Sequence, residues 1–402
     1  MQNHTKIHGF YKIKLIFILA LMSSLAPLST DMYLAALNRV QESFQTNPFF
    51  TQLSLASFFI AFAFGQLIYG PLSDTFGRKK PALIGMLIFI TSSFGCVVID
   101  NIYSFIVLRF FEALGGCAGV VIARAIVNDL FDFEEAAGVY ALMMIFSSLA
   151  PMLSPTLGAF LIQYFPWQSI FTFLFFLGIF LFFMVLFGLK ESAPHLKRQK
   201  FSHKATLKNY QYVLKDRTFL VYVLCAAFTM ATIFAYITGS NFIFVNFFGI
   251  SEQNFAFLFG LNALSFMICA NLNTRILKKF NAQNILAIAL LVMLIAHFIM
   301  LLNAYFSPKI WLFEISLLSI LATLGFIMPN TTILAMSRFK DHSGTASAIL
   351  GTTQFAFAGI VAFIVGAFEA NTPIFLSFIM FLAVLLANLI FFASANHRNL
   401  RH

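Results

Sequence analysis

Charged side chains are scarce in this chain: Asp, Glu, Lys and Arg together make up 10% of its 402 residues. Soluble domains carry about a quarter of such residues. Apolar residues reach 60% and the mean hydropathy is +0.88, so a soluble protein is excluded. The formal net charge of +10 would suggest nucleic acid as the partner of a soluble chain. Here membrane topology accounts for that charge, and we expect no nucleic-acid partner.

Recognisable catalytic and metal-binding motifs are also lacking. The four cysteines lie far apart in apolar segments, with neither CxxC nor Cys/His spacing, so no disulfide framework and no metal site are expected. The sequence contains no HExxH, GxSxG, carboxylate dyad or Walker-type glycine loop, which disfavours a membrane-embedded enzyme. A channel would favour repeated pore charges, whereas this chain has one buried acid–base pair. We therefore expect neither an enzyme nor a cofactor.

Apolar stretches long enough to cross a bilayer recur twelve times. Each is too uniformly apolar for a strand of a lipid-embedded barrel. The expected fold is therefore all-α, with twelve transmembrane helices in two six-helix halves. The predicted spans are 15–37, 51–73, 81–99, 102–127, 138–164, 168–189, 218–240, 253–275, 284–304, 310–336, 344–368 and 374–394.

Lysine and arginine are distributed unevenly between alternate loops. With a cytoplasmic N-terminus, 21 of the 25 Lys and Arg residues fall in inner segments, and the outer loops hold only Arg39 and Lys309. This asymmetry follows the positive-inside rule, so we expect a multi-pass protein of the cytoplasmic (inner) membrane with both termini in the cytoplasm. A basic cytoplasmic linker, 190–217, separates the N-terminal half, 1–189, from the C-terminal half, 218–402. Such an arrangement is typical of transporters built by internal duplication.

Ionisable residues within the spans are the first candidates for function, because a charge at the centre of a helix costs about 2.5–3.5 kcal/mol on insertion scales. Asp31 lies in the first span, and Arg109 and Glu112 lie three residues apart on one face of the fourth, where they can pair. A carboxylate that shares a cavity with a guanidinium can load and release a proton. The alternatives are an Asp31 bonded to Ser29 or Thr30 for structural reasons, and a Glu112 that only neutralises Arg109.

Three further ionisable residues are weaker candidates for a functional role. Glu314 is five residues beyond Lys309, close enough to the outer surface that we expect water to solvate it. Arg124 lies near the inner end of its span, and we assign it to the cytoplasmic surface. His297 lies mid-span in the ninth segment, and we interpret it as a packing residue.

The turn between the second and third spans, residues 70–81, reads GPLSDTFGRKKP. Glycine allows a tight reversal at the membrane surface, and the cations hold the loop inside. Asp74 can satisfy the N-terminus of a neighbouring helix. Topology alone explains the cations but not the acidic and glycine positions, so we expect a functional role for Gly70, Asp74, Gly77, Arg78 and Lys79.

This turn resembles the signature loop of the major facilitator superfamily, G-x-L-x-D-x-x-G-R-[KR]-[KR]. Residues 109–116 of the fourth span resemble the R-x-x-[QH]-G motif of the same family, with Glu112 where Gln or His is commoner. Residues 150–159 of the fifth span are similar to the antiporter motif G-P-x-x-G-G, with Ser154 and Ala159 in place of two glycines. The matching positions of that helix are Pro151, Pro155 and Gly158, and both prolines would bend it.

Within the superfamily, residues 27–34, PLSTDMYL, resemble the Bcr/CflA drug-resistance branch, as do residues 344–348, GTASA. The resemblance implies a proton-coupled efflux carrier in which Asp31 and Arg109 are the membrane-embedded coupling positions. It also implies that Asp74 caps the cytoplasmic end of the eleventh span. Members of the branch export drugs such as bicyclomycin and chloramphenicol-type compounds, and some export small metabolites.

Together these observations predict an antiporter that exports small organic compounds in exchange for protons, through a central cavity between two six-helix halves. The expected partners are a small-molecule substrate, protons and the lipid bilayer, and we expect a monomer. The proton gradient takes the place of a cofactor. The alternative is a proton-linked transporter of a metabolite such as a sugar or an amino acid, which predicts a more polar pocket. The candidate substrate-binding residues are Tyr33, Tyr236, Asn262 and Gln354.

Overall fold

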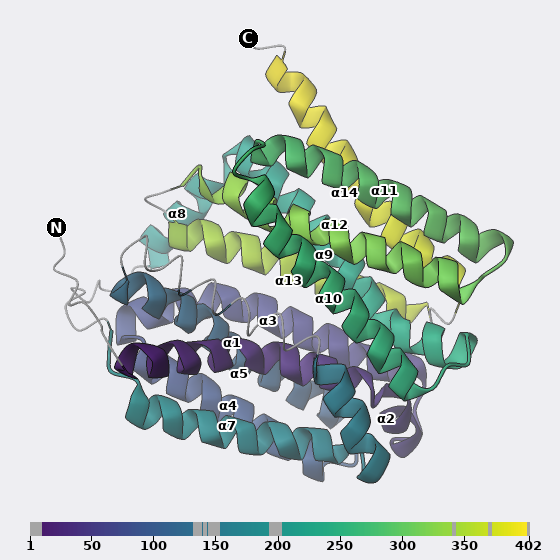
Figure 1. Cartoon of the computed structure of the whole chain (residues 1–402). Coiled ribbons are helices and arrows are strands. Elements are labelled where there is room, and N and C mark those ends of the chain that lie inside the picture. The colour runs from purple at the N-terminus through teal and green to yellow at the C-terminus, as the bar shows by residue number, and fades with distance from the viewer. Residues whose placement is uncertain are drawn as a thin grey trace. The chain divides into compact units, whose positions relative to one another are not determined.

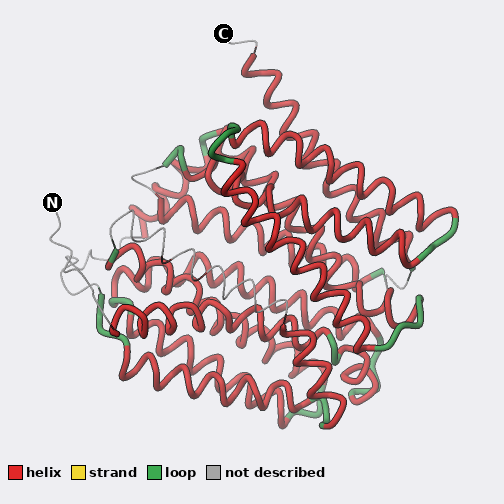
Figure 2. Tube along the Cα trace, viewed as in Figure 1, coloured by secondary structure: helices red, strands yellow, loops and turns green. Residues whose placement is uncertain are grey.

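The computed structural model describes residues 10–131, 153–192, 203–339, 343–368 and 372–399, together with Val139 and Met143. The described chain consists of helices joined by loops and turns and contains no strand, as Figure 2 shows. The chain divides into two compact units. Unit 1 comprises Met1–Thr46 and Ser57–Ser202, and unit 2 comprises Asn47–Ala56 and His203–His402.

In unit 1, helix α4 packs against α5 and α7, and α1 packs against the same two helices (Figure 1). Residues 153–164 are also helical. Asn101 caps α5, because its side-chain oxygen accepts hydrogen bonds from the backbone N–H groups of Tyr103 and Ser104. The helices are α1 (Phe10–Leu34), α2 (Leu37–Ser43), α3 (Pro48–Phe76), of which the residues up to Ala56 belong to unit 2, α4 (Lys79–Val98), α5 (Ile102–Leu130) and α7 (Gln168–Gly188).

In unit 2, α9 packs against α12, α13 and α14, and α12 also contacts α10 and α11. Side chains of Asp216, Ser251 and Asn281 cap α9, α10 and α11, which fixes where these helices begin after polar turns. The elements are α8 (His203–Leu214), α9 (Arg217–Asn241), the π-helical turn η1 (Phe242–Phe247), α10 (Glu252–Ile276), α11 (Ala282–Phe306), α12 (Ile310–Met336), α13 (Ser343–Ala367) and α14 (Pro373–Asn399).

Eleven helices in the described part of the chain are long and apolar enough to cross a membrane. They coincide within a few residues with eleven of the predicted spans, because the length of each apolar run sets the length of its helix. The predicted span 138–164 lies largely outside the described residues. The structure therefore gives an all-helical membrane protein and leaves the twelfth span a prediction.

Two segments differ from the sequence-based expectation. The first span ends at Leu34 instead of residue 37, and the polar run that follows forms the short helix α2, which buries only Leu37 and Val40. The predicted linker 190–217 contains helix α8. A short amphipathic helix carries many polar residues, so its sequence is easily taken for a loop.

Helices α4 and α5 approach closely where α5 carries Gly115. A Cβ at this position would lie 2.5 Å from the backbone nitrogen of Phe89 and 2.6 Å from the carbonyl oxygen of Gly85, both on α4. One turn later, a Cβ at Gly119 would overlap the carbonyl oxygen of Met22 on α1. These two glycines therefore serve close helix packing, with small residues at the interface as in other membrane helices.

We expect Gly115→Ala to lower the stability of the folded chain by about 1–3 kcal/mol, because the methyl group overlaps backbone atoms that cannot move away independently. Thermal unfolding of the purified full chain in detergent measures this loss. Gly344→Ala is the matched control, since a Cβ there has no neighbouring atom within 4 Å. Equal melting temperatures for the two variants would contradict the packing role of Gly115.

Candidate functional site

Arg109 on α5 is one of the largest fully buried side chains in the described part of unit 1, with an exposed fraction of 0%. Its Nη1 donates hydrogen bonds to Oε2 of Glu112 at 2.6 Å and to Oγ of Ser29 on α1 at 2.7 Å. The predicted pairing across one turn of α5 is therefore present in the structure. The second carboxylate oxygen of Glu112 accepts a hydrogen bond from Oγ of Ser93 on α4, at 3.1 Å. One ion pair thus connects α1, α4 and α5.

Three aromatic rings surround the guanidinium of Arg109. Its Cζ lies 4.9 Å from the ring centroid of Tyr33, 4.6 Å from that of Phe58 and 5.6 Å from that of Phe171. The Nε and Nη2 atoms are buried and make no hydrogen bond within the described chain. The π faces therefore stabilise the part of the cation that no oxygen contacts. Tyr33, a predicted substrate-binding residue, is fully buried in this aromatic group.

Asp31 lies on α1, two residues after Ser29, and its side chain is buried with an exposed fraction of 5%. Oγ1 of Thr30 lies 3.1 Å from Asp31 Oδ1 and hydrogen-bonds to it. Within the described residues no cation forms an ion pair with Asp31, since Arg109 is paired with Glu112. Pro27, one turn earlier on α1, lacks the backbone N–H that would otherwise donate to the carbonyl oxygen of residue 23.

The helix that carries the antiporter-like motif contacts α1 next to Asp31. Pro155 and Gly158 lie in the helical residues 153–164, and a Cβ at Gly158 would overlap the carbonyl oxygen of Met32. Gly158 therefore permits close contact between this helix and α1. Pro151 lies outside the described residues.

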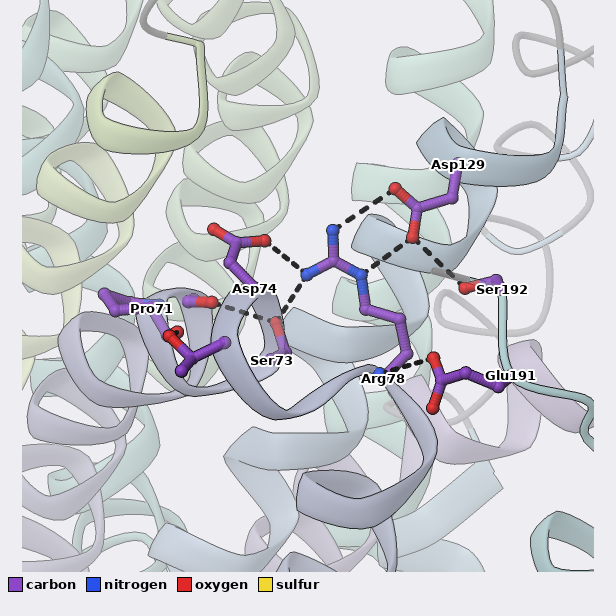
Figure 3. A network of polar contacts seen from close by, with 9 residues as sticks. Pro71, Ser73, Asp74, Arg78, Asp129, Glu191 and Ser192 are labelled. Carbon is purple, nitrogen blue, oxygen red and sulfur yellow. Dashed lines mark hydrogen bonds and ion pairs between the residues drawn. The ribbon is translucent and has the colours of Figure 1, made fainter. Parts of the chain in front are cut away.

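The signature loop is held by Arg78, whose guanidinium is almost fully buried between two carboxylates (Figure 3). Its Nε and Nη2 donate to the two carboxylate oxygens of Asp129, at 2.7 and 3.2 Å, and its Nη1 donates to Asp74 and to Ser73. Burial favours the neutral form, but the hydrogen bonds and charges of Asp129 and Asp74 outweigh it and raise the pKa of Arg78. Arg78 therefore stays charged and joins α3, α4 and the end of α5.

Glu191, just beyond α7, caps the N-terminus of α4 (Figure 3). Its Oε1 accepts from the backbone nitrogen of Arg78 at 2.7 Å, and its Oε2 accepts from that of Lys79 at 3.2 Å. Gly77 has φ of +85°, and a Cβ there would lie 2.6 Å from Glu191 Oε2, so glycine is required both for the backbone and for the cap. Lys79 Nζ donates to the carbonyl oxygen of Leu186 at 2.7 Å.

One expectation for the loop is corrected by the structure. Gly70 lies inside helix α3 and takes no part in the reversal, which Gly77 makes alone. Sequence reasoning also missed the partners Asp129 and Glu191, which are 51 and 113 residues away from Arg78. Their only signal was an acidic residue at the inner end of an apolar run.

In unit 2 the structure brings together two of the predicted substrate-binding residues, Tyr236 on α9 and Asn262 on α10. Asn262 Nδ2 lies 3.2 Å from the hydroxyl of Tyr236 and donates to Oε1 of Glu314 on α12 at 3.0 Å. The prediction that Glu314 is solvated was wrong, because its exposed fraction is 4%. It lies one turn inside α12, on the face covered by α10. Gln354 is buried on α13, and no hydrogen bond from it to these residues occurs in the described chain.

The family model of the Major Facilitator Superfamily matches residues 19–363. The chain belongs to the major facilitator superfamily. Its sequence is 32% identical over 97% of both chains to the uncharacterised MFS-type transporter YdgK of Bacillus subtilis (strain 168). It is 27% identical to a bicyclomycin resistance protein homologue of Haemophilus influenzae, covering 97% of this chain and 98% of the relative. A chloramphenicol resistance protein of Pseudomonas aeruginosa is 27% identical, covering 86% of this chain and 81% of the relative.

Solved structures agree on the fold. A D-xylose–proton symporter matches with a TM-score of 0.75 at 16% identity, covering 94% of this chain and 97% of the other. A bacterial homologue of the lysosomal transporter Spinster also reaches 0.75, at 14% identity, covering 97% and 98%. The chain is therefore a membrane transporter and not an enzyme. The names of its relatives are consistent with the Bcr/CflA drug-resistance branch.

We expect Glu112→Leu to destabilise the chain by about 3–5 kcal/mol, because it leaves the buried guanidinium of Arg109 without its carboxylate. The double variant Arg109→Met with Glu112→Leu should lose less, since both charges are then removed. Thermal unfolding of the wild type, both single variants and the double variant gives the coupling energy of the pair. A Glu112→Leu variant that melts with the wild type would show that the ion pair does not stabilise unit 1.

Proposed function

We propose that this transporter is a proton-coupled antiporter that exports small organic compounds from the cytoplasm across the inner membrane. We also propose that the chain has twelve spans, the fifth of them at residues 138–164. The spans form two six-helix halves, residues 1–189 and 218–402, joined by a cytoplasmic linker, residues 190–217. Both termini then lie in the cytoplasm. The eleven described spans and the basic inner segments support this layout. The names of the drug-resistance relatives support the class of cargo.

The observation that carries the proposal is the buried carboxyl group of Asp31, which has no cationic partner within the described chain. An ionised carboxylate is costly in such surroundings unless a positive charge compensates it. Arg109, which is bonded to Ser29 two residues before Asp31, is already neutralised by Glu112. Asp31 is thus left to take its positive charge from a proton or from the cargo.

This division of roles gives antiport a physical basis. Proton and cargo compensate the same carboxyl group at different stages, so each favours release of the other. A proton that enters from outside favours release of the cargo there. Ser29 lies on the same helix as Asp31 and accepts a hydrogen bond from Arg109. A movement of α1 therefore changes the surroundings of the guanidinium. In this scheme Arg109 favours loss of the proton in one of the two conformations.

For the signature loop we propose a role in the conformational change. The carboxyl group of Asp74 is bonded to Arg78 through one oxygen, but its side chain is 65% exposed. Asp129, in contrast, is 14% exposed and uses both oxygens on Arg78. Asp129 therefore positions Arg78, whereas Asp74 is free to exchange partners as the transporter opens and closes.

A second candidate function is proton-linked transport of a metabolite. The observation that favours it is the polar group of unit 2, where an amide, a phenol and a carboxyl group meet in the membrane interior. A panel of antibiotics and metabolites, tested on cells with and without the gene and repeated with a protonophore, separates the candidates. Drug resistance that the protonophore abolishes supports export of drugs, whereas changed uptake of a nutrient supports the second candidate.

We expect Asp31→Asn to abolish export driven by a pH gradient in proteoliposomes of the full chain, because asparagine cannot take up the proton. Exchange of labelled for unlabelled cargo, which needs no net proton movement, should persist. Asp100→Asn is the control, since this aspartate is exposed in the turn between α4 and α5. Full gradient-driven export by Asp31→Asn would refute the proposed coupling role.

We expect Asp74→Asn to reduce transport while the melting temperature stays close to that of the wild type, because this exposed carboxylate contributes little to stability. Asp129→Asn should instead lower the melting temperature, because the nearly buried guanidinium of Arg78 then loses the negative charge of its Asp129 partner. Transport assays and thermal unfolding of both variants check the distinction. Wild-type turnover in Asp74→Asn would exclude its role in the conformational change.

A further inference from the structure

A buried polar group joins three helices of unit 2. Glu314 on α12, Asn262 on α10 and Tyr236 on α9 have exposed fractions of 4%, 1% and 2%. The amide nitrogen of Asn262 lies 3.0 Å from Glu314 Oε1 and 3.2 Å from the hydroxyl of Tyr236. Tyr236 also stacks on Phe259 of α10, with ring centroids 5.4 Å apart. The carboxyl group of Glu314 is therefore enclosed by its neighbours.

Two acceptor atoms in this group have no donor. Glu314 Oε2 and Asn262 Oδ1 are buried and make no hydrogen bond in the described part of the chain. Buried oxygens without partners cost free energy, about 1–3 kcal/mol for a neutral group and more for a charged one. The group of Glu314, Asn262 and Tyr236 therefore has more acceptor atoms than donors to bond them.

No charged group on the helices packed against α12 compensates Glu314. The helices in contact with α12 are α9, α10, α11 and α13, and α13 carries no acidic or basic residue. His297 on α11 is bonded to the carbonyl oxygen of Met293 at 2.8 Å. No ion pair to Glu314 occurs among the described residues. The other titratable residues of these helices and of the start of α12 are Arg217, Tyr222, Cys225, Glu252, Cys269, Arg275, Tyr305 and Lys309.

We propose that Glu314 is a proton-binding site of unit 2, separate from Asp31, in which Asn262 holds the protonated carboxyl group. A proton on Oε2 turns one unpaired acceptor into a donor, and Asn262 Oδ1 is an unpaired acceptor on the amide that already donates to Oε1. Carboxylic acid and amide then complement each other with two hydrogen bonds. One proton thus removes the uncompensated charge and satisfies both orphaned oxygens.

A proton fits this site better than an organic cation does. It needs no space beyond the carboxyl oxygen, whereas an ammonium group must be admitted among side chains that are at most 4% exposed. Release of the proton would remove one of the two bonds between Glu314 and Asn262 and leave a charge between α12 and α10. The protonation of Glu314 therefore changes the contact between α10 and α12 at this position, whereas the bonds of Ser265 to Leu318 and of Asn330 to Asn273 stay in place.

Infrared spectroscopy of the full chain in lipid tests the site without any transport assay. We expect the C=O stretching band of protonated carboxyl groups at neutral pH to lose one component in Glu314→Gln. Glu42→Gln, which changes an exposed glutamate on α2, should leave the band unchanged. Asp31→Asn should leave the Glu314 component in place, so failure of the export proposal and failure of this one are distinguishable.

Asn262→Ala provides a second variant that keeps the carboxyl group and does not depend on how well Glu314→Gln folds. It should shift the frequency of the same component, because the C=O group loses the hydrogen bond from Nδ2. A band that is the same in the wild type, Glu314→Gln and Asn262→Ala would overturn the proposal. Binding of tetraphenylphosphonium that Glu314→Gln abolishes, without any change in the carboxyl band, would also overturn it and assign the site to organic cations.

Discussion

A guanidinium that is fully removed from water constrains the whole of unit 1. Arg109 can remain in the membrane interior only because one carboxylate, one hydroxyl and three aromatic faces share its charge. These groups come from α1, α3, α5 and α7, so compensation of one charge constrains the rotation of four helices about their axes. With Arg109 satisfied by Glu112, the carboxyl group of Asp31 is the acid of α1 left without a counter-ion in the described chain.

The loop between α3 and α4 also holds an arginine by ion pairs, here at the edge of the membrane, but the number and exposure of its carboxylate partners differ. Arg78 has two carboxylates where Arg109 has one, and one of the two, Asp74, is open to solvent. An exposed ion pair is weak and exchangeable, whereas a buried pair cannot lose one member without a large penalty. Unit 1 therefore combines a fixed charge centre within the membrane with a labile one at its surface, which suits a protein that must change conformation while its helices stay intact.

The sequence alone predicts those features that depend on local spacing. The spans follow from the length of apolar runs, and the pairing of Arg109 with Glu112 follows from their separation by three residues on one helix. The contacts of Asp129 and Glu191 with Arg78 could not be predicted from the sequence, because packing of distant helix ends brings these residues together. Glu314 was misjudged for a related reason. The distance of Glu314 from the end of its span indicates how deep the residue lies in the membrane. It does not indicate whether neighbouring helices cover the side of α12 that carries Glu314.

The cap on α4 has a consequence for biosynthesis. Glu191 is separated from Arg78 by 113 positions and Ser192 from Asp129 by 63, so both contacts wait until the sixth predicted span, 168–189, has left the ribosome. Until then the backbone N–H groups of Arg78 and Lys79 lack the carboxylate that caps them in the complete chain. Chains truncated before residue 191 would therefore lack two of the contacts that hold the turn between α3 and α4 and the end of α5.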